Sequence, residues 1–201
     1  MLAEHLVYNA AIAIVVGMIF FRFTGRDNSW IIILVTYVPD LDKITGPVLR
    51  QFGITVLIEG QRIQHGTFHN IAVMVVFAVL MGFLLHPFGI PYFDSCILSA
   101  IGFSGHLFED ALVYPASYKY LWPFSNKLLG LAWLPTGISE ESYTANFLHI
   151  ANAEVLSIGL VILLGVALFR TWYEGTGWIR WYMPEKVYRN IFLPSVKEKT
   201  P

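Results

Sequence analysis

The chain has 201 residues, of which 56% are hydrophobic and only 13% are charged. With a mean hydropathy of +0.59, it is too apolar for an ordinary soluble domain. The formal net charge of −1 excludes the strongly basic surface of a nucleic-acid-binding protein. The single cysteine, Cys96, excludes an internal disulfide and a cysteine-rich zinc site. These features predict an all-α integral membrane protein in the cell membrane, with the lipid bilayer as its main partner.

Apolar runs predict about five transmembrane helices. The first, Leu6 to Phe23, is long enough to cross a bilayer, and it lacks the basic region and cleavage site of a signal peptide, so we expect an uncleaved anchor. The second, Trp30 to Val38, has nine apolar residues and cannot cross about 30 Å alone at 1.5 Å per residue. It is either a re-entrant half-helix or a span extended by its flanks, Asp27–Ser29 and Pro39–Leu41.

Three further spans are predicted over Ile71–Leu85, Ser95–Tyr114 and Ile150–Phe169. A loop rich in proline and glycine (115–137) and a polar stretch (139–146) separate the last two. After residue 170, aromatic residues interleaved with arginine and lysine predict an interfacial helix. The expected division is therefore a transmembrane domain, residues 1–170, and an interfacial or cytoplasmic C-terminal tail, residues 171–201.

Ionisable residues inside the fourth predicted span indicate a functional site. His106, Glu109 and Asp110 interrupt an otherwise apolar run, and a charged residue at a helix centre costs roughly 2.5–3.5 kcal/mol on insertion. Because His106 and Asp110 are four residues apart, they share one helix face. The simpler alternative is a His–Asp hydrogen bond that only joins two helices. Groups of this kind need a partner, a metal or a water-filled cavity.

Five alternating crossings would bring every unusual polar residue to one face of the membrane. Each lies at the end of a predicted span that reaches this face. The candidate metal ligands are His5, Asp40, Asp42, His65, His69, His106, Asp110 and Glu154.

Histidine and carboxylate ligands suit zinc, and also manganese or iron. The candidates outnumber the four ligands that zinc usually takes, so the surplus either binds a second ion or supports the ligands through hydrogen bonds. Paired divalent ions about 3.5–4 Å apart recur in enzymes that hydrolyse phosphoesters. In such a mechanism Asp42, Glu109 or Asp110 would be the general base, and the sequence does not choose among them.

The order of these motifs resembles the YdjM-type family of multipass inner-membrane proteins, described as metal-dependent hydrolases and, for the bacterial member, regulated through LexA. The resemblance covers about residues 1–130. It rests on Glu4-His5-Leu6, Val38-Pro39-Asp40-Leu41-Asp42, His69-Asn70, Gly102-x-x-x-His106-Leu107-x-x-Asp110 and Leu121-Trp122-Pro123-Phe124.

The chain departs from the family pattern at two places. Lys43 stands where the family has a histidine, and Gln64-His65 stands where it has His-Arg. Either His65 replaces that histidine as a ligand through a one-residue shift, or one ligand is missing. More faintly, the order of histidines and aspartates is similar to zinc-dependent phospholipase C, which implies a phosphoester substrate of lipid type.

The resulting hypothesis is a membrane-embedded, metal-dependent hydrolase that acts on a small-molecule or lipid phosphoester. The alternative is a non-enzymatic membrane protein, either a metal or proton transporter or a structural partner, that uses the same residues. A transporter should carry polar residues deep in both halves of the bundle, whereas Ile71–Leu85 and Ile158–Phe169 are bare. Eight basic residues on the opposite face against five on the motif face predict that the site lies outside the cytoplasm.

Overall fold

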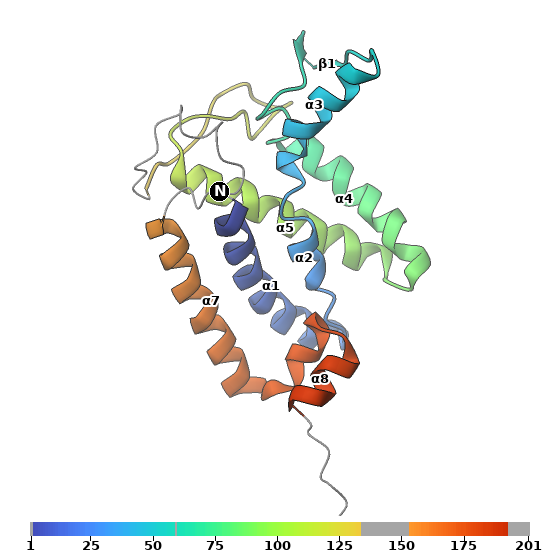
Figure 1. Ribbon diagram of the computed structural model, residues 1–201, viewed down its shortest axis with the longest axis vertical. Coiled ribbons are helices and arrows are strands. Elements are labelled where there is room, and N and C mark those ends of the chain that lie inside the picture. The colour runs from blue at the N-terminus through green and yellow to red at the C-terminus, as the bar shows by residue number, and fades with distance from the viewer. Residues whose placement is uncertain (1, 59, 134–152, 193–201) are drawn as a thin grey trace, which may run out of the picture.

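The computed structural model describes residues 2–58, 60–133 and 153–192, which form a bundle of helices (Figure 1). Within these ranges, four helices are long and apolar enough to cross a membrane. They are α1 (Leu2–Thr24), α4 (Ile71–Leu85), α5 (Tyr92–Val113) and α7 (Ala153–Glu174). The predicted fold class, an all-α membrane bundle, is confirmed. The polar stretch 139–146 and the start of the fifth predicted span, residues 150–152, lie outside the described residues.

The second predicted span is a broken segment. Its helical part, α2 (Trp30–Leu34), has five residues and gives way to turns and then to a 3₁₀ helix, η1 (Pro39–Leu41). Pro39 has no N–H to donate to the Val35 carbonyl, which instead accepts the Val38 N–H at 3.1 Å. The Thr36 hydroxyl adds to the break by donating to the Ile32 carbonyl at 3.2 Å. Among the described residues, the structure thus has four helices of spanning length where the sequence predicted about five spans.

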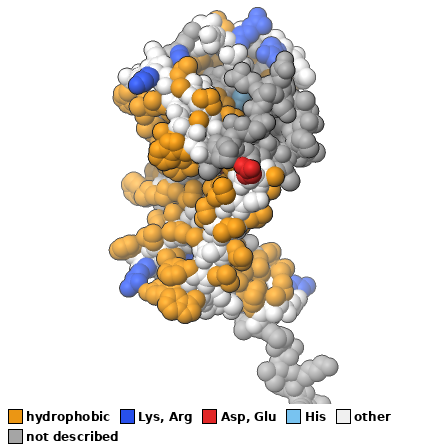
Figure 2. Space-filling view, turned by 90° about the vertical axis from the view of Figure 1, so that its left-hand side faces the viewer, with side chains coloured by type: hydrophobic (Ala, Val, Ile, Leu, Met, Phe, Trp, Pro, Cys, Tyr) orange, Lys and Arg blue, Asp and Glu red, His pale blue; other side chains and the backbone are white. Residues whose placement is uncertain are grey.

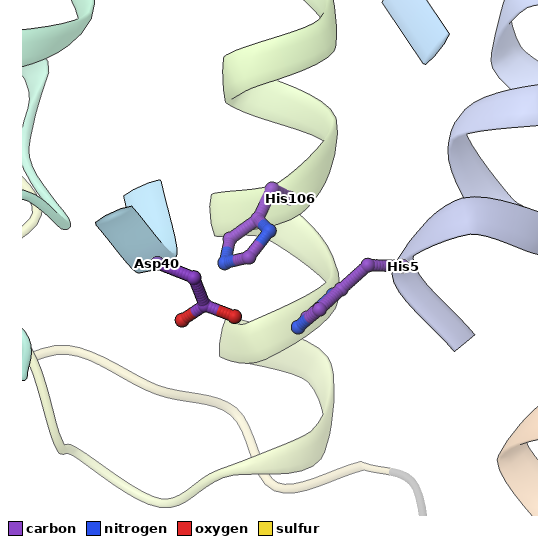
Figure 3. A group of neighbouring side chains, drawn as sticks. All are labelled: His5, Asp40 and His106. Atoms are coloured by element: carbon purple, nitrogen blue, oxygen red, sulfur yellow. The ribbon is translucent and has the colours of Figure 1, made fainter. Parts of the chain in front are cut away.

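This segment is packed inside the bundle along α1, between Gly17 and His5. At one end, a Cβ added to Gly17 would lie 2.4 Å from the Ser29 hydroxyl oxygen, so the close approach requires glycine. At the other end, Asp40 lies beside His5 (Figure 3). Because non-helical backbone is tolerated at membrane depth only where protein covers it, the burial of this segment explains how it can be irregular.

The core lies where α1, α2, α4 and α5 meet. Ile31, Ile32 and Leu98 are fully buried there. A Cβ on Gly102 would lie 2.7 Å from the Ile32 carbonyl oxygen, so this glycine lets α5 pack directly against the α2 backbone. The outer surfaces are apolar instead of polar, as Figure 2 shows for one face. Val76 of α4 and Val161 of α7, for example, are 60% and 72% exposed. Such a surface fits a lipid solvent.

Short elements cover the two ends of the bundle. One end carries α3 (Asp42–Gln51) and a hairpin of β1 (Leu57–Ile58) with β2 (Gln61–Arg62). The opposite end carries η3 (Thr176–Tyr182) and α8 (Glu185–Phe192), which confirms the predicted C-terminal helix. The remaining 3₁₀ helix, η2 (His86–Phe88), follows α4.

A buried arginine ties the C-terminal end to the rest of the bundle. Arg170, 1% exposed, donates to Asp27 at 2.8 Å, to Glu174 at 2.8 Å and to the Ile14 carbonyl at 3.1 Å. The Tyr182 hydroxyl donates to the Ala13 carbonyl at 3.0 Å. Because its charge is compensated, Arg170 does not end the last span: α7 continues to Glu174, past the predicted end at Phe169.

Candidate metal centre

Three histidines and two aspartates meet at the end of the bundle that holds the start of α1. His5 comes from α1, His106 and Asp110 from α5, Asp40 from η1, and His69 from the loop before α4. The His5 and His106 rings are stacked with centroids 3.8 Å apart, and both face the Asp40 carboxylate (Figure 3). These residues form overlapping groups in which the possible ligand atoms lie within 4.8 Å of one another, as a bound metal ion requires.

Asp110 is central to this cluster. Its Oδ1 lies 3.6 Å from His5 Nε2, and its Oδ2 lies 3.3 Å from His69 Nε2 and 3.5 Å from His106 Nε2. Asp110 is 1% exposed and the three histidines are completely buried. One carboxylate therefore faces the same nitrogen atom of three imidazoles.

The other nitrogen of each of these histidines contacts a group that holds the ring in place. His106 Nδ1 donates to the Thr36 carbonyl at 2.8 Å, since a carbonyl can only accept. His5 Nδ1 contacts the Glu109 carboxylate. His69 Nδ1 faces Asp42 Oδ2 at 3.5 Å and, like His69 Nε2, forms no hydrogen bond with a described residue. Metal-binding histidines typically use one nitrogen in this way, which leaves the other for the ion. Here all three Nε2 atoms are left on the cluster side.

The atoms on the cluster side lack hydrogen bonds. Nε2 of His5, His69 and His106 and both carboxylate oxygens of Asp110 are buried and form no hydrogen bond with any described residue. Buried polar atoms are nearly always hydrogen-bonded, so several such atoms in one place indicate an ion or another ligand. Their chemistry, imidazole nitrogen and carboxylate oxygen, fits zinc, manganese or iron.

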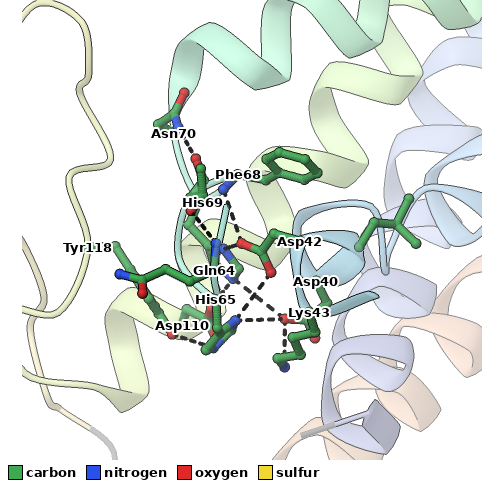
Figure 4. Close-up of polar contacts among 12 residues, drawn as sticks. Asp40, Asp42, Lys43, Gln64, His65, Phe68, His69, Asn70, Asp110 and Tyr118 are labelled. Atoms are coloured by element: carbon green, nitrogen blue, oxygen red, sulfur yellow. Dashed lines mark hydrogen bonds and ion pairs between the residues drawn. The ribbon is translucent and has the colours of Figure 1, made fainter. Parts of the chain in front are cut away.

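His65 lies at the edge of the same cluster (Figure 4). Its Nδ1 is 3.4 Å from Asp42 Oδ1 and 3.8 Å from Asp40 Oδ1, and its Nε2 is 2.9 Å from the Tyr118 hydroxyl. With Asp40 and His69, it forms one of the candidate ligand groups. Lys43 Nζ pairs with Asp40 Oδ1 at 2.8 Å and so places a positive charge at this edge.

Comparison with known families identifies the chain. The model of the YdjM inner membrane protein family matches residues 1–183. The chain belongs to this family. No curated protein and no solved structure matches it. The family and the four apolar helices together establish a multi-pass protein of the cell membrane. These matches do not show the fainter similarity to zinc-dependent phospholipase C.

The positions at which the chain departs from the YdjM-type pattern can now be placed. His65, and not Gln64, lies beside Asp40 and His69, whereas Gln64 lines a neighbouring cavity. This arrangement favours the one-residue shift over the loss of a ligand. Lys43, in place of a histidine, binds Asp40 directly.

The carboxylates of the cluster perturb the pKa values of the groups that lie outside the spans. Burial alone would lower the pKa of His69, but the close Asp110 and Asp42 carboxylates outweigh it and raise the pKa to about 9. Burial alone would raise the pKa of Asp42, but its contacts with His65 and His69 hold it well below the usual range. Histidines and carboxylates of the cluster therefore stabilise each other's charged forms.

One predicted ligand is not brought into the cluster. Glu154 lies in the first turn of α7, is exposed, and belongs to none of the candidate groups among the described residues. The prediction placed Glu154 at the correct end of the bundle, but the alternation of spans does not determine which way a helix face points.

The residues that support the ligands were not recognised from the sequence pattern. The Thr36 carbonyl carries no side-chain signal, and Tyr118 lies in a loop without periodicity. Asn9 is 1% exposed, and its amide makes no hydrogen bond with a described residue. Asn9 lies one helical turn after His5 and could have been recognised as a second polar residue on the same face of an apolar helix.

Proposed function

We propose that the protein is a membrane-embedded, metal-dependent hydrolase that acts on a phosphoester. The observation that carries the proposal is the convergence of three oriented histidines on Asp110, with all their inner atoms lacking hydrogen bonds among the described residues. Zinc is the first candidate metal because the donor set is rich in histidine. A divalent ion bound there would polarise a phosphoryl oxygen and lower the pKa of a coordinated water to about 7.

The roles of the three candidate catalytic carboxylates follow from their contacts. Asp110 faces three histidines, which suits a ligand. Asp42 uses Oδ1 toward His65, and its Oδ2 accepts the Phe68 N–H at 3.1 Å and faces His69. Glu109 binds His5 through Oε2, while its buried Oε1 has no hydrogen bond to a described residue. Because each contacts the Nδ1 atom of a histidine, Glu109 and Asp42 are positioning residues of this proposal, and these contacts select no general base among the three carboxylates.

The ligand groups also support a site for two ions. Three groups of three residues overlap, with Asp40, His69 and His106 each belonging to two of them. A shared carboxylate such as Asp40 is the usual bridge between paired ions that hydrolyse phosphoesters. The Lys43 ammonium beside Asp40 partly opposes a second cation there. Because the shared carboxylate favours a second ion and the ammonium opposes it, the test of the proposed function should also count the bound ions per chain.

A lipid substrate is supported by where the cluster lies. It forms where η1 leads into α3, at the end of the bundle that carries α3 and the hairpin (Figure 1). The apolar side chains of Ile44 and Val48 on α3 are 51% and 41% exposed. A membrane-spanning protein with an apolar surface at this level presents its site near the head groups of the bilayer.

The transporter alternative has one observation in its favour, since Asp27, Ser29 and Arg170 are buried in the other half of the bundle. These residues bind one another, however. Between them and the metal centre lie Ile31 and Ile32 of α2 and the following Val35, which are 0–1% exposed. Along this segment, apolar side chains therefore separate the two polar groups, which favours the hydrolase, although Asn9, Ser95 and Ser99 are further buried polar residues of the described bundle.

The proposal is tested on protein purified without chelators. We expect elemental analysis to find bound zinc, manganese or iron. We also expect hydrolysis of short-chain phospholipids or polyprenyl phosphates that stops on chelation and returns with the metal. Protein that binds no divalent metal, or hydrolysis that chelation does not change, would refute the proposal.

A further inference from the structure

A cavity of about 200 Å³, lined by both polar and apolar residues, opens beside the metal centre. Its walls come from the hairpin, the loop between β2 and α4, and the loop after α5. The lining includes Gln61, Gln64, His65, Tyr118, Lys119 and Trp122. Several of these residues and their neighbours are drawn in Figure 4.

Two residues connect the cavity to the metal centre. His65 and Tyr118 line the cavity, and each also touches the cluster: His65 contacts Asp42, and the Tyr118 ring stacks on His69 with centroids 4.5 Å apart. Gly66 allows this arrangement because it adopts a φ of +92°, and a Cβ there would lie 2.9 Å from the Tyr118 ring. A ligand in the cavity would therefore lie directly against the wall of the metal centre.

The charges of the two compartments are opposite. The metal centre contains four carboxylates, those of Asp40, Asp42, Glu109 and Asp110. The described lining of the cavity contains the ammonium of Lys119 and no carboxylate, and it adds the side-chain amides of Gln61 and Gln64 as hydrogen-bond donors. The metal centre therefore suits a cation, whereas the cavity suits an anion.

We propose that this cavity binds the phosphate-bearing head group of the substrate, with Lys119 and Gln64 holding its anionic oxygens. The inference rests on the proposed function, because it places the reacting phosphoester between the cavity and the metal centre. Pockets that enclose a whole drug-sized ligand measure about 300–1,000 Å³. A volume of about 200 Å³ therefore accommodates a compact head group such as glycerol phosphate and leaves any acyl chain outside.

The test measures binding by isothermal titration to the full chain in detergent, with and without zinc. The probes are glycerol phosphate and, as a neutral control, glycerol. We expect Lys119→Gln to weaken the binding of glycerol phosphate about tenfold or more, the range for one lost hydrogen bond to a charged group. Lys127→Gln changes an exposed lysine of the same loop that lies outside the cavity, and we expect it to leave the affinity unchanged. Glycerol should not bind.

A second variant tests the cavity without disturbing the packing of its wall. Tyr118→Phe keeps the ring that packs on His69 and Gly66 but removes the hydroxyl that contacts His65. We expect this variant to keep its metal content and its melting temperature while the KM for the phosphoester rises. Equal affinity for glycerol phosphate in wild type and Lys119→Gln would overturn the inference, even if hydrolysis is observed.

The outcomes also separate this inference from the proposed function. Binding that depends on Lys119 but is accompanied by no hydrolysis would refute the hydrolase and retain the anion site. Nanodiscs containing phosphatidic acid provide a further arm. If they displace glycerol phosphate, the head group belongs to a lipid, and if they do not, the site takes a soluble organic phosphate.

Discussion

The substitution Asp110→Asn tests the metal centre most directly. Asparagine keeps the shape of the side chain but removes the charge that faces three histidine nitrogens at 3.3–3.6 Å. Loss of a supporting residue weakens metal binding about 10–100-fold, and loss of a ligand should reach at least the upper end. Zinc at 100 times its Kd stabilises the wild type by about 2.7 kcal/mol, and a 100-fold weaker site retains about 0.4 kcal/mol.

The expected loss at that zinc concentration is therefore about 2.3 kcal/mol, or a decrease in melting temperature of about 5–9 °C for a chain of this length. Without zinc, this zinc-dependent loss should be absent. Any change that remains then reflects the loss of the Asp110 carboxylate as a partner of His69, whose pKa it helps to raise, so the shift in melting temperature should differ between the two conditions.

The assay is thermal unfolding in detergent, followed by tryptophan fluorescence in chelator and across a zinc titration. Asp94→Asn is the matched control. Asp94 is a buried carboxylate at the other end of α5, where it pairs with Arg26 at 3.2 Å. Asp94→Asn should change the melting temperature by the same amount with and without zinc. If Asp110→Asn also shows one shift under both conditions, zinc does not bind through Asp110 and the reasoning fails.

Three further predictions concern the rest of the cluster and the opposite end of the bundle. His69→Ala should abolish metal-dependent hydrolysis, whereas His86→Ala, an exposed histidine at the other end of α4, should leave it nearly intact; comparable effects would mean that neither histidine is a ligand. In zinc-free protein, the pKa of His69 is raised from 6.5 to about 9. This shift contributes up to roughly 3 kcal/mol to the free energy of unfolding. The contribution is complete below pH 6.5 and is lost as the pH rises through 9. The lowered pKa of Asp42 contributes stability above pH 3.8 that is lost at lower pH, so melting temperatures measured against pH should be highest between about 4 and 6.5. Asp27→Ala should destabilise the protein by about 3–5 kcal/mol because it leaves Arg170 buried without this partner; an additional Arg170→Leu should restore part of that loss in denaturant unfolding, and no restoration would contradict the assigned pairing.

The position of the site could be predicted from the sequence because alternating spans return the chain to the same membrane face. His5, Asp40, His69 and Asp110 come from different elements, and counting the crossings was sufficient to bring them together. This counting fixes the level of a residue in the bundle but not its direction around the helix axis. For that reason it included Glu154, which is exposed.

The different roles of the carboxylates within the site could not be predicted in the same way. Asp42 and Asp110 are both buried aspartates, but Asp42 contacts the Nδ1 atoms of His65 and His69, whereas Asp110 contacts three Nε2 atoms. Residue spacing does not distinguish the two nitrogens of an imidazole, since the distinction depends on side-chain rotation in the folded protein. The predicted sidedness of the membrane remains a prediction, which a reporter fused after the C-terminus would test.

The interruption after α2 makes one contact of the site insensitive to side-chain mutation. In an unbroken helix, the Thr36 carbonyl would accept the N–H of Asp40, four residues ahead. Here it points to α5 and accepts a hydrogen bond from His106 at 2.8 Å. The proton on His106 is thus directed by the main chain, which every amino acid at position 36 would supply. Thr36 is itself buried, so replacement by a residue of similar size, such as valine, would keep this acceptor, whereas a change that restores the regular helix would remove it.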